Sequence, residues 1–257
     1  IKLILKKIDL FTNEAEIINI IAFNYSINEI FTENKDIIKK VEKLKIKVNL
    51  IRSYQDLKKK IFSNSELGIS YGFGIIFKNK FIEKYKEGIW NIHPGDLPAY
   101  RGRHPITAAF LNNEKRIGLS IHIINEKIDQ GFLLAKYFVK RNYQDDEISI
   151  KKKLFKNLRT LLKKAQTNFK NKKITKILKG KYYKPFYKGI KIKDSNKVDY
   201  MYIYNAAKAQ KCFGGIIVNG IRYKDATFYL KKKVNYLNKV ITCKDFKKLI
   251  LIKKIKK

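Results

Sequence analysis

Three side chains with complementary chemistry come from two short stretches of the sequence. Asn91 and His93 alternate at the end of the apolar run 88–93, and Asp129 follows the apolar run 118–124. Because side chains alternate along a strand, Asn91 and His93 share one face. An imidazole can move a proton near neutral pH, and a carboxamide N–H can stabilise an oxyanion. The pair therefore favours acyl transfer to an amine.

A carboxylate that orients the imidazole would complete this group. Asp129 lies in the expected loop 125–130, two residues before Gly131, whose missing side chain allows a close backbone approach. If the strand 118–124 runs parallel beside 88–93, their carboxyl ends meet and Asp129 reaches His93. The rival carboxylates are Asp96, Glu126, Asp145 and Asp146.

The elements that must position these residues alternate between strands and helices. We expect strands at 17–23, 46–51, 67–71 and 88–93, with helices at 34–44 and 53–62. Ser53, with Asp56 three residues later, forms a start similar to a capping box. Such an alternation predicts an α/β fold with a doubly wound, mostly parallel, Rossmann-like sheet. No G-x-G-x-x-G occurs, so dinucleotide binding has no support.

The second half of the chain changes character. We expect a helix at 105–111, strands at 118–124 and 131–139, one long helix at 145–169 and a linker at 180–194. The tail predicts a helix at 198–209 and strands at 214–219, 222–230, 237–243 and 249–252. We therefore expect a catalytic domain at 1–185 and a small β-rich subdomain at 195–257. The opening strand at 1–5 is short and interrupted by Lys2.

The composition is strongly basic. The chain has 257 residues, with 58 lysines and arginines against 22 acidic residues, for a net charge of +36. Only seven of the basic residues are arginines, and lysine, isoleucine and asparagine are abundant, which indicates an AT-rich genome more than nucleic-acid recognition. Two isolated cysteines, and no apolar run near the ~18–20 residues of a membrane span, lead us to expect a cytoplasmic protein.

Three motifs occur in a characteristic order. They are N-x-H-P at 91–94, L-P-x-Y-R-G at 97–102 and I-D-x-G at 128–131. Together they resemble the formyltransferases that use N10-formyltetrahydrofolate, a family that includes methionyl-tRNA formyltransferase, glycinamide ribonucleotide transformylase and the sugar N-formyltransferases. The segment Y-G-F-G-I-I at 71–76 stands where this family carries Y-G-x-x-L/I-P, with Phe77 in place of the proline. The formyltransferase fold is therefore what we expect.

The resemblance implies a role for each matching residue. Asn91 would donate to the formyl oxygen, His93 would transfer the proton, and Asp129 would orient His93. A substrate amine would attack the formyl carbon through a tetrahedral intermediate and release tetrahydrofolate, with no metal. The folate-binding residues that the resemblance implies are Tyr71, Phe73, Gly74, Ile75, Ile76, Ile128 and Gly131.

The amine acceptor is a separate question. The chain lacks the basic insertion of methionyl-tRNA formyltransferases, and about sixty tail residues stand where those enzymes have a larger carboxyl-terminal domain. We therefore expect a nucleotide-linked amino-deoxysugar, as in lipopolysaccharide biosynthesis, with methionyl-tRNA as the alternative. Tyr100, Arg101 and Arg103 are the expected substrate contacts, the two arginines facing a pyrophosphate. Arg101 and Arg103 are equally compatible with being simple loop charges. Whether the protein forms a homodimer stays open.

Other interpretations remain at this stage. His104 would cap the following helix, and His122, between two isoleucines, would be a surface or satisfied polar residue. A nucleic-acid-binding module that uses the basic helix and tail would bind with a steep salt dependence. A degenerate relative with a scaffold role would not bind folate. The intact set of Asn91, His93 and Asp129 argues against degeneracy.

Overall fold

The computed structural model describes residues 5–59, 65–186, 189–229, 238–245 and 247–253. The chain divides into two compact units that interleave along the sequence. The first contains Ile1–Arg101, Gly118–Tyr137 and Phe155–Lys181, and the second contains Gly102–Ile117, Phe138–Leu154 and Tyr182–Lys257. The division into domains at 1–185 and 195–257 stays a prediction. Asn91, His93 and Asp129 all belong to the first unit.

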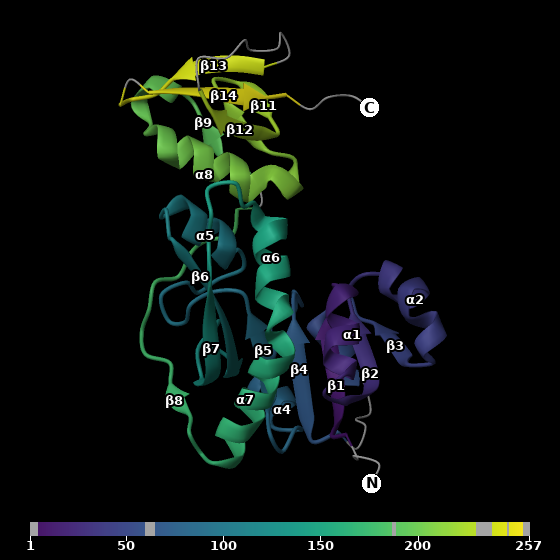
Figure 1. Ribbon diagram of the computed structural model, residues 1–257. Coiled ribbons are helices and arrows are strands. Elements are labelled where there is room, and N and C mark those ends of the chain that lie inside the picture. The colour runs from purple at the N-terminus through teal and green to yellow at the C-terminus, as the bar shows by residue number, and fades with distance from the viewer. Residues whose placement is uncertain (1–4, 60–64, 187–188, 230–237, 246, 254–257) are drawn as a thin grey trace. The chain divides into compact units, whose positions relative to one another are not determined.

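An eight-stranded sheet organises the first unit, with strand order β3-β2-β1-β4-β5-β6-β7-β8 (Figure 1). β1 to β5 pair in parallel, whereas β5 pairs with β6 and β7 with β8 in antiparallel. The expected mostly parallel α/β sheet is therefore confirmed. The strands are β1 Lys7–Thr12, β2 Ser26–Thr32, β3 Lys47–Leu50, β4 Leu67–Tyr71, β5 Ile89–His93, β6 Arg116–Ile123, β7 Phe132–Lys140 and β8 Thr175–Lys176.

Helices connect these strands. They are α1 Glu16–Ala22, α2 Asp36–Val41 with the 3-10 turn η1 Glu42–Leu44, α3 Tyr54–Lys59, α4 Asn79–Ile82, α5 Pro105–Leu111, α6 Glu147–Lys156 and α7 Leu158–Lys170. α3 has the expected start, because the Asp56 carboxylate accepts from the backbone N–H of Ser53 at 3.1 Å. The helices α2, α3 and α5 and the strands β3 to β7 all lie within or close to their expected ranges.

The largest departures from expectation lie near the amino terminus and after β7. The run 17–23, expected as a strand, falls largely in α1, where Ile17, Ile18 and Ile21 are all buried. A short apolar run does not distinguish a strand from a buried helix, so tertiary packing decides. The first strand among the described residues is β1; the expected strand 1–5 lies, except for its last residue, outside them. The expected long helix is two helices, separated at Asn157.

The two faces of the sheet in the first unit have different cores. On one face α1 and α7 lie side by side, and Asn24 donates to the carbonyl oxygen of Arg159 at 2.9 Å (Figure 1). Trp90 packs on that face against Phe169 of α7, with ring centroids 5.3 Å apart. Ile89 joins the aromatic cluster of the opposite face. Because side chains alternate along β5, Asn91 and His93 face the same side as Ile89.

The aromatic cluster of that second face supports the carboxyl ends of the parallel strands. Its buried members are Phe11, Phe31, Ile51, Leu57, Phe77, Phe81, Tyr85 and Ile89. Phe77, which stands where the related motif has proline, stacks on Phe73 and Phe81 at 5.6 Å in each case. The substitution is therefore absorbed into the core. Phe77 anchors the loop after β4 through this burial, in place of the rigid backbone that a proline would give.

The second unit contains the expected tail elements. α8 Tyr200–Gln210 packs on α5 and on β12, and two three-stranded sheets have the orders β11-β10-β9 and β12-β14-β13. Their strands are β9 Lys191–Ile192, β10 Ile216–Val218, β11 Ile221–Tyr223, β12 Asp225–Phe228, β13 Asn238–Thr242 and β14 Lys248–Ile252. The expected strand 222–230 is thus split between β11 and β12, its last residue lying outside the described ones.

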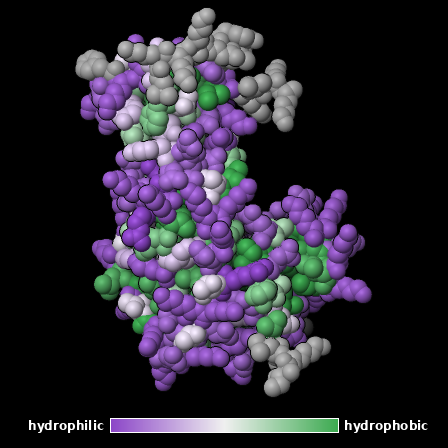
Figure 2. Space-filling view, viewed as in Figure 1, coloured by the Kyte–Doolittle hydropathy of each residue, from purple (hydrophilic) through white to green (hydrophobic). Residues whose placement is uncertain are grey.

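The viewed surface is largely hydrophilic (Figure 2). Figure 2 shows hydrophilic residues over most of the viewed face, with apolar residues in small, separate groups. Among the described residues, no helix is both long and apolar enough to span a bilayer.

Candidate active site

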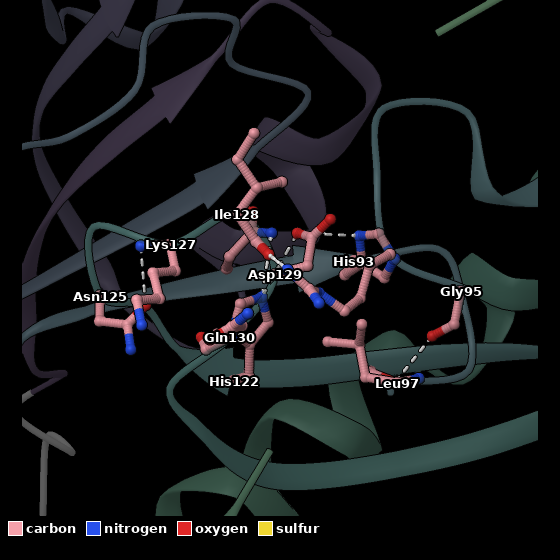
Figure 3. A network of polar contacts seen from close by, with 12 residues as sticks. His93, Gly95, Leu97, His122, Asn125, Lys127, Ile128, Asp129 and Gln130 are labelled. Carbon is pink, nitrogen blue, oxygen red and sulfur yellow. Dashed lines mark hydrogen bonds and ion pairs between the residues drawn. The ribbon is translucent and has the colours of Figure 1, made fainter. Parts of the chain in front are cut away.

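His93 and Asp129 meet in the first unit. His93, the last residue of β5, is 4% exposed, and its Nδ1 lies 3.4 Å from Oδ1 of Asp129 (Figure 3). Its Nε2 lies 2.7 Å from the backbone oxygen of Tyr100. A carbonyl only accepts hydrogen bonds, so Nε2 carries a hydrogen and is occupied. Nδ1 is the ring nitrogen that faces Asp129.

The contact forms for a reason other than the one expected from sequence. β5 and β6 are antiparallel, with Trp90 opposite Ile123 and His93 opposite Ser120, so their carboxyl ends do not meet. The expectation that these two strands run in parallel is wrong. The loop after β6 instead doubles back toward the end of β5, and Figure 3 shows Asp129 pointing from this loop at His93.

Backbone geometry makes this return possible. Asp129 has φ of 50° and Gly131 has φ of 106°, so two residues of the turn adopt left-handed backbone. A Cβ on Gly131 would lie 2.0 Å from the carbonyl oxygen of Ile123. Gly131 was expected to bind folate, but its described environment gives it a structural role. It lets the loop pass directly over β6 and return Asp129 to His93.

Substitution of Gly131 by alanine is expected to destabilise the protein severely. The collision with the Ile123 carbonyl adds to the strain of a positive φ, and we expect more than ~3 kcal/mol of lost unfolding free energy. Gly189→Ala is the matched control, because Gly189 has φ of +67° and nothing within 4 Å of an added Cβ. The control should lose only about 1 kcal/mol. Urea unfolding of both variants measures the difference, and equal losses would contradict this role of Gly131.

Arg101 ties the returning loop to another segment of the chain through hydrogen bonds. Its Nε and Nη2 donate to the carbonyl oxygen of Ile128 at 3.1 and 2.9 Å, and Nη1 donates to Gly180 at 3.3 Å. The residue is only 9% exposed. We expected Arg101 to face a pyrophosphate, but the structure engages its guanidinium with backbone carbonyls. The planar fork of arginine suits this bridging of two chain segments.

The amide of Asn91 meets a second histidine. Asn91 is opposite His122 in the β5–β6 register, and its Nδ2 lies 3.3 Å from Nε2 of His122. His122 Nδ1 lies 3.1 Å from the carbonyl oxygen of Gln130, and its Nε2 is 3.9 Å from Oδ1 of Asp129. Burial lowers the pKa of His122 to about 4, so the ring is neutral at pH 7.

His122 is the site residue that sequence reasoning missed. Of the two positions that we expected, surface or satisfied polar, His122 has the second: it is fully buried, and both ring nitrogens lie near hydrogen-bond partners, but its place beside Asn91 was not foreseen. An antiparallel alignment of 88–93 with 118–124 would have placed it opposite Asn91. The signal was a polar residue in an apolar strand, on the face that carries Asn91.

The residues expected to bind folate fall into two groups. Tyr71 is 2% exposed and packs edge-on against Phe155, and Phe73 and Ile75 pack against the aromatic cluster. The backbone N–H of Gly74 donates to Glu33 at 2.6 Å. Ile76 and Ile128 instead expose 52% and 41% of their surfaces. The loops that carry these two are bridged by Glu126, which accepts from the backbone N–H of Asn79 at 3.0 Å.

The remaining candidates have other surroundings. Tyr100 is 8% exposed and contributes its backbone oxygen to His93. Arg103 is exposed and belongs to the second unit. His104 does not cap α5 with its side chain; its Nδ1 accepts from the backbone N–H of Phe186 at 3.0 Å.

Asp129 has no rival at His93 among the carboxylates considered. Asp96 pairs with Nζ of Lys136 at 2.7 Å, and Glu126 accepts from Asn79. Asp145 and Asp146 lie in the second unit, where Asp145 pairs with Lys153 and Asp146 with Lys211. Side-chain chemistry, and not cavity volume, identifies this site: a cavity of about 620 Å³ lies in the second unit, between Lys191 and Tyr202, and contains none of these residues.

Known proteins resemble the chain in sequence over part of its length. A methionyl-tRNA formyltransferase of Pseudothermotoga lettingae is 42% identical over 66 residues, which are 26% of this chain and 22% of that protein. Another, of Borrelia garinii subsp. bavariensis, is 35% identical over 107 residues, which are 41% of this chain and 32% of that protein. The chain thus aligns with about a third or less of the length of these relatives.

Solved structures resemble the chain over nearly all of its length. The sugar 3N-formyltransferase WlaRD, solved with dTDP and 5-N-formyl-THF, has a TM-score of 0.71 at 18% identity and covers 99% of both chains. An N-formyltransferase of Helicobacter canadensis, in complex with folinic acid and dTDP-3-aminofucose, has a TM-score of 0.71 at 19% identity, covering 97% of this chain and 100% of that one. These similarities establish the fold.

The family itself is established by sequence. A model of the formyl transferase family matches residues 25–165, which is more than half of the chain and contains Asn91, His93 and Asp129. The expected resemblance is therefore confirmed, and the chain belongs to the formyl transferase family.

Proposed function

We propose that this protein transfers a formyl group from N10-formyltetrahydrofolate to the primary amine of a nucleotide-linked amino-deoxysugar. The observation that carries the proposal is the convergence of His93 Nδ1 and Asp129 Oδ1 at 3.4 Å, with the amide of Asn91 on the same face of β5. An imidazole backed by a carboxylate, beside an amide donor, can move a proton and stabilise an oxyanion at one carbonyl.

Each of the three residues has one task in the transfer. When the amine nitrogen bonds to the formyl carbon, the carbonyl oxygen takes up the electron pair, and an N–H of Asn91 stabilises this developing oxyanion. His93 transfers protons through Nδ1, because Tyr100 occupies Nε2. Asp129 holds the ring in place through the contact of Oδ1 with Nδ1 at 3.4 Å. As the tetrahedral intermediate collapses, the bond to N10 breaks, and N10 receives the proton that the amine gives up.

The loops beside this group suit a folate. N10-formyltetrahydrofolate is a second substrate with a flat heterocycle, and binding sites for such ligands combine apolar walls with a few polar groups. Ile76 and Ile128 offer exposed apolar side chains on two loops that Glu126 and Asn79 bridge. Tyr71 is packed in the core, so its contribution to folate binding is indirect, through the position of the loop that follows it.

Two comparisons bear on the acceptor. The similarity to sugar N-formyltransferases extends over 97–99% of this chain, including the tail. The two methionyl-tRNA enzymes described above match 26% and 41% of the chain in sequence. The extent of the match favours a sugar nucleotide. The higher local identity to the methionyl-tRNA enzymes keeps Met-tRNA as the second candidate.

An acceptor panel tests the proposal. The protein would be incubated with N10-formyltetrahydrofolate and, separately, dTDP-linked and UDP-linked amino-deoxysugars, glycinamide ribonucleotide and Met-tRNA, and products scored by mass. We expect an added formyl group on an amino-deoxysugar nucleotide. Formylation of Met-tRNA alone would replace the acceptor with the second candidate. Absence of tetrahydrofolate release with every acceptor, from folded protein, would overturn formyl transfer itself.

A further inference from the structure

His122 is a buried histidine that the proposed reaction does not use directly. We infer that it is a positioning residue, which accepts a hydrogen bond from Asn91 and thereby aims the second N–H of that amide at the formyl oxygen. The inference rests on the proposed formyl transfer for its catalytic consequence. The hydrogen-bond arrangement behind it is a property of the protein alone.

The neighbours of His122 select one tautomer. Nδ1 lies 3.1 Å from the carbonyl oxygen of Gln130, which can only accept, so Nδ1 must carry the hydrogen. In the neutral ring Nε2 is then an acceptor. The opposite tautomer would set the lone pair of Nδ1 against the Gln130 carbonyl in a site that is 0% exposed. Such an unsatisfied pair of acceptors is costly where water cannot enter.

The charged groups around the ring are compatible with this assignment. Asp129 Oδ1 lies 3.9 Å from Nε2, beyond hydrogen-bond distance, and the ring of His93 is perpendicular to that of His122 with centroids 6.4 Å apart. Asp129 favours the charged ring, whereas His93 and, above all, burial favour the neutral one. Burial has the largest effect, and it lowers the pKa of His122 to about 4.

An acceptor at Nε2 decides which way the Asn91 amide points. With Nδ2 toward His122 at 3.3 Å, one N–H is donated to Nε2 and the other is directed away from it. The flipped amide would place Oδ1 against the Nε2 lone pair and lose the hydrogen bond. Without His122 the two orientations become similar in energy, and the oxyanion donor is correctly placed only part of the time.

Two amide substitutions separate this role from simple filling of space. A glutamine amide overlays Nε2 of histidine and an asparagine amide overlays Nδ1. His122→Gln can therefore still accept from Asn91, whereas His122→Asn keeps only the donor to Gln130. We expect His122→Asn to lower kcat roughly 10- to 100-fold, less than the ~10²–10³-fold cost of removing an oxyanion donor, with KM for the formyl donor unchanged. His122→Gln should stay within about fivefold of the natural protein, because its side-chain oxygen replaces the Nε2 acceptor.

A double substitution localises the effect. In an Asn91→Ala background, His122→Asn should cause no further loss of kcat, because the residue through which it acts is gone. Equal activity of both His122 variants, whether natural or reduced, would overturn the inference. So would additive losses in the Asn91→Ala background.

The tautomer of His122 can be measured in the natural protein independently of enzymatic activity. Nitrogen-15 NMR of labelled histidine distinguishes a protonated from an unprotonated ring nitrogen. We expect His122 at pH 7 to show hydrogen on Nδ1 and none on Nε2, and the reverse would overturn the inference even in an active enzyme. If the tautomer is as expected but no acceptor is formylated, the proposed function fails and the positioning of Asn91 stands.

Discussion

His93→Ala is expected to remain folded and to lose about 10²–10⁴-fold in kcat/KM for formyl transfer, the range of a positioned general acid or base. The side chain is buried at the end of β5, with Nε2 held by Tyr100 and Nδ1 facing Asp129. No second imidazole can substitute, because His122 directs its own nitrogens at Gln130 and Asn91. Steady-state assays with N10-formyltetrahydrofolate measure the loss.

His104→Ala is the matched control for this prediction. His104 is half-buried in the second unit, and its ring accepts from the backbone N–H of Phe186. Burial together with the positive charge of Arg103 lowers its pKa, so the substitution removes a neutral ring. Turnover should stay within about threefold of the natural protein, whereas unchanged turnover in His93→Ala would contradict the assignment.

Asp129→Asn is expected to lower kcat by about 10²–10³-fold without unfolding the loop. Asparagine has the same size and, like aspartate, tolerates the left-handed backbone that Asp129 adopts at φ of 50°. The change removes the negative charge beside His93 Nδ1 and leaves Gly131 and Arg101 to hold the turn. Single-turnover rates measure the chemical step directly.

Asp96→Asn provides a matched carboxylate control. Asp96 lies three residues after His93 in sequence, but its carboxylate pairs with Lys136 at 2.7 Å, and both side chains are about one-third exposed. Such a pair contributes about 0–1 kcal/mol to stability, so stability and turnover should change little. If Asp96→Asn lost as much activity as Asp129→Asn, general electrostatics and not orientation of His93 would explain the loss.

The grouping of the candidate site residues was predictable because it depends on local pattern. Alternation along one strand places Asn91 and His93 on one face, and the motif order connects them with Asp129. The helix start at Ser53 and the turn residue Gly131 were likewise set by short-range chemistry. Residues whose roles depend on a neighbour a few positions away are accessible to this kind of reasoning.

Roles that depend on the pairing of segments far apart in the sequence could not be predicted from the sequence. The direction of β6 decides whether His122 faces Asn91, and nothing within 118–124 specifies that direction. Arg101 meets Ile128 and Gly180, 27 and 79 positions away, so its conversion from an expected substrate contact to a loop support needs the folded chain. The isoleucine-rich run in α1 is ambiguous for the same reason, because its packing on the sheet and not its own composition determines its structure.

The most direct test of the account is a crystal structure of this protein with 5-formyltetrahydrofolate. We expect a formyl oxygen within hydrogen-bond reach of Asn91 Nδ2, at about 3 Å, and His93 Nδ1 within about 3–4 Å of the same group. A folate bound with its formyl group more than roughly 6 Å from both atoms would contradict the convergence of Asn91, His93 and Asp129 on one reacting carbonyl.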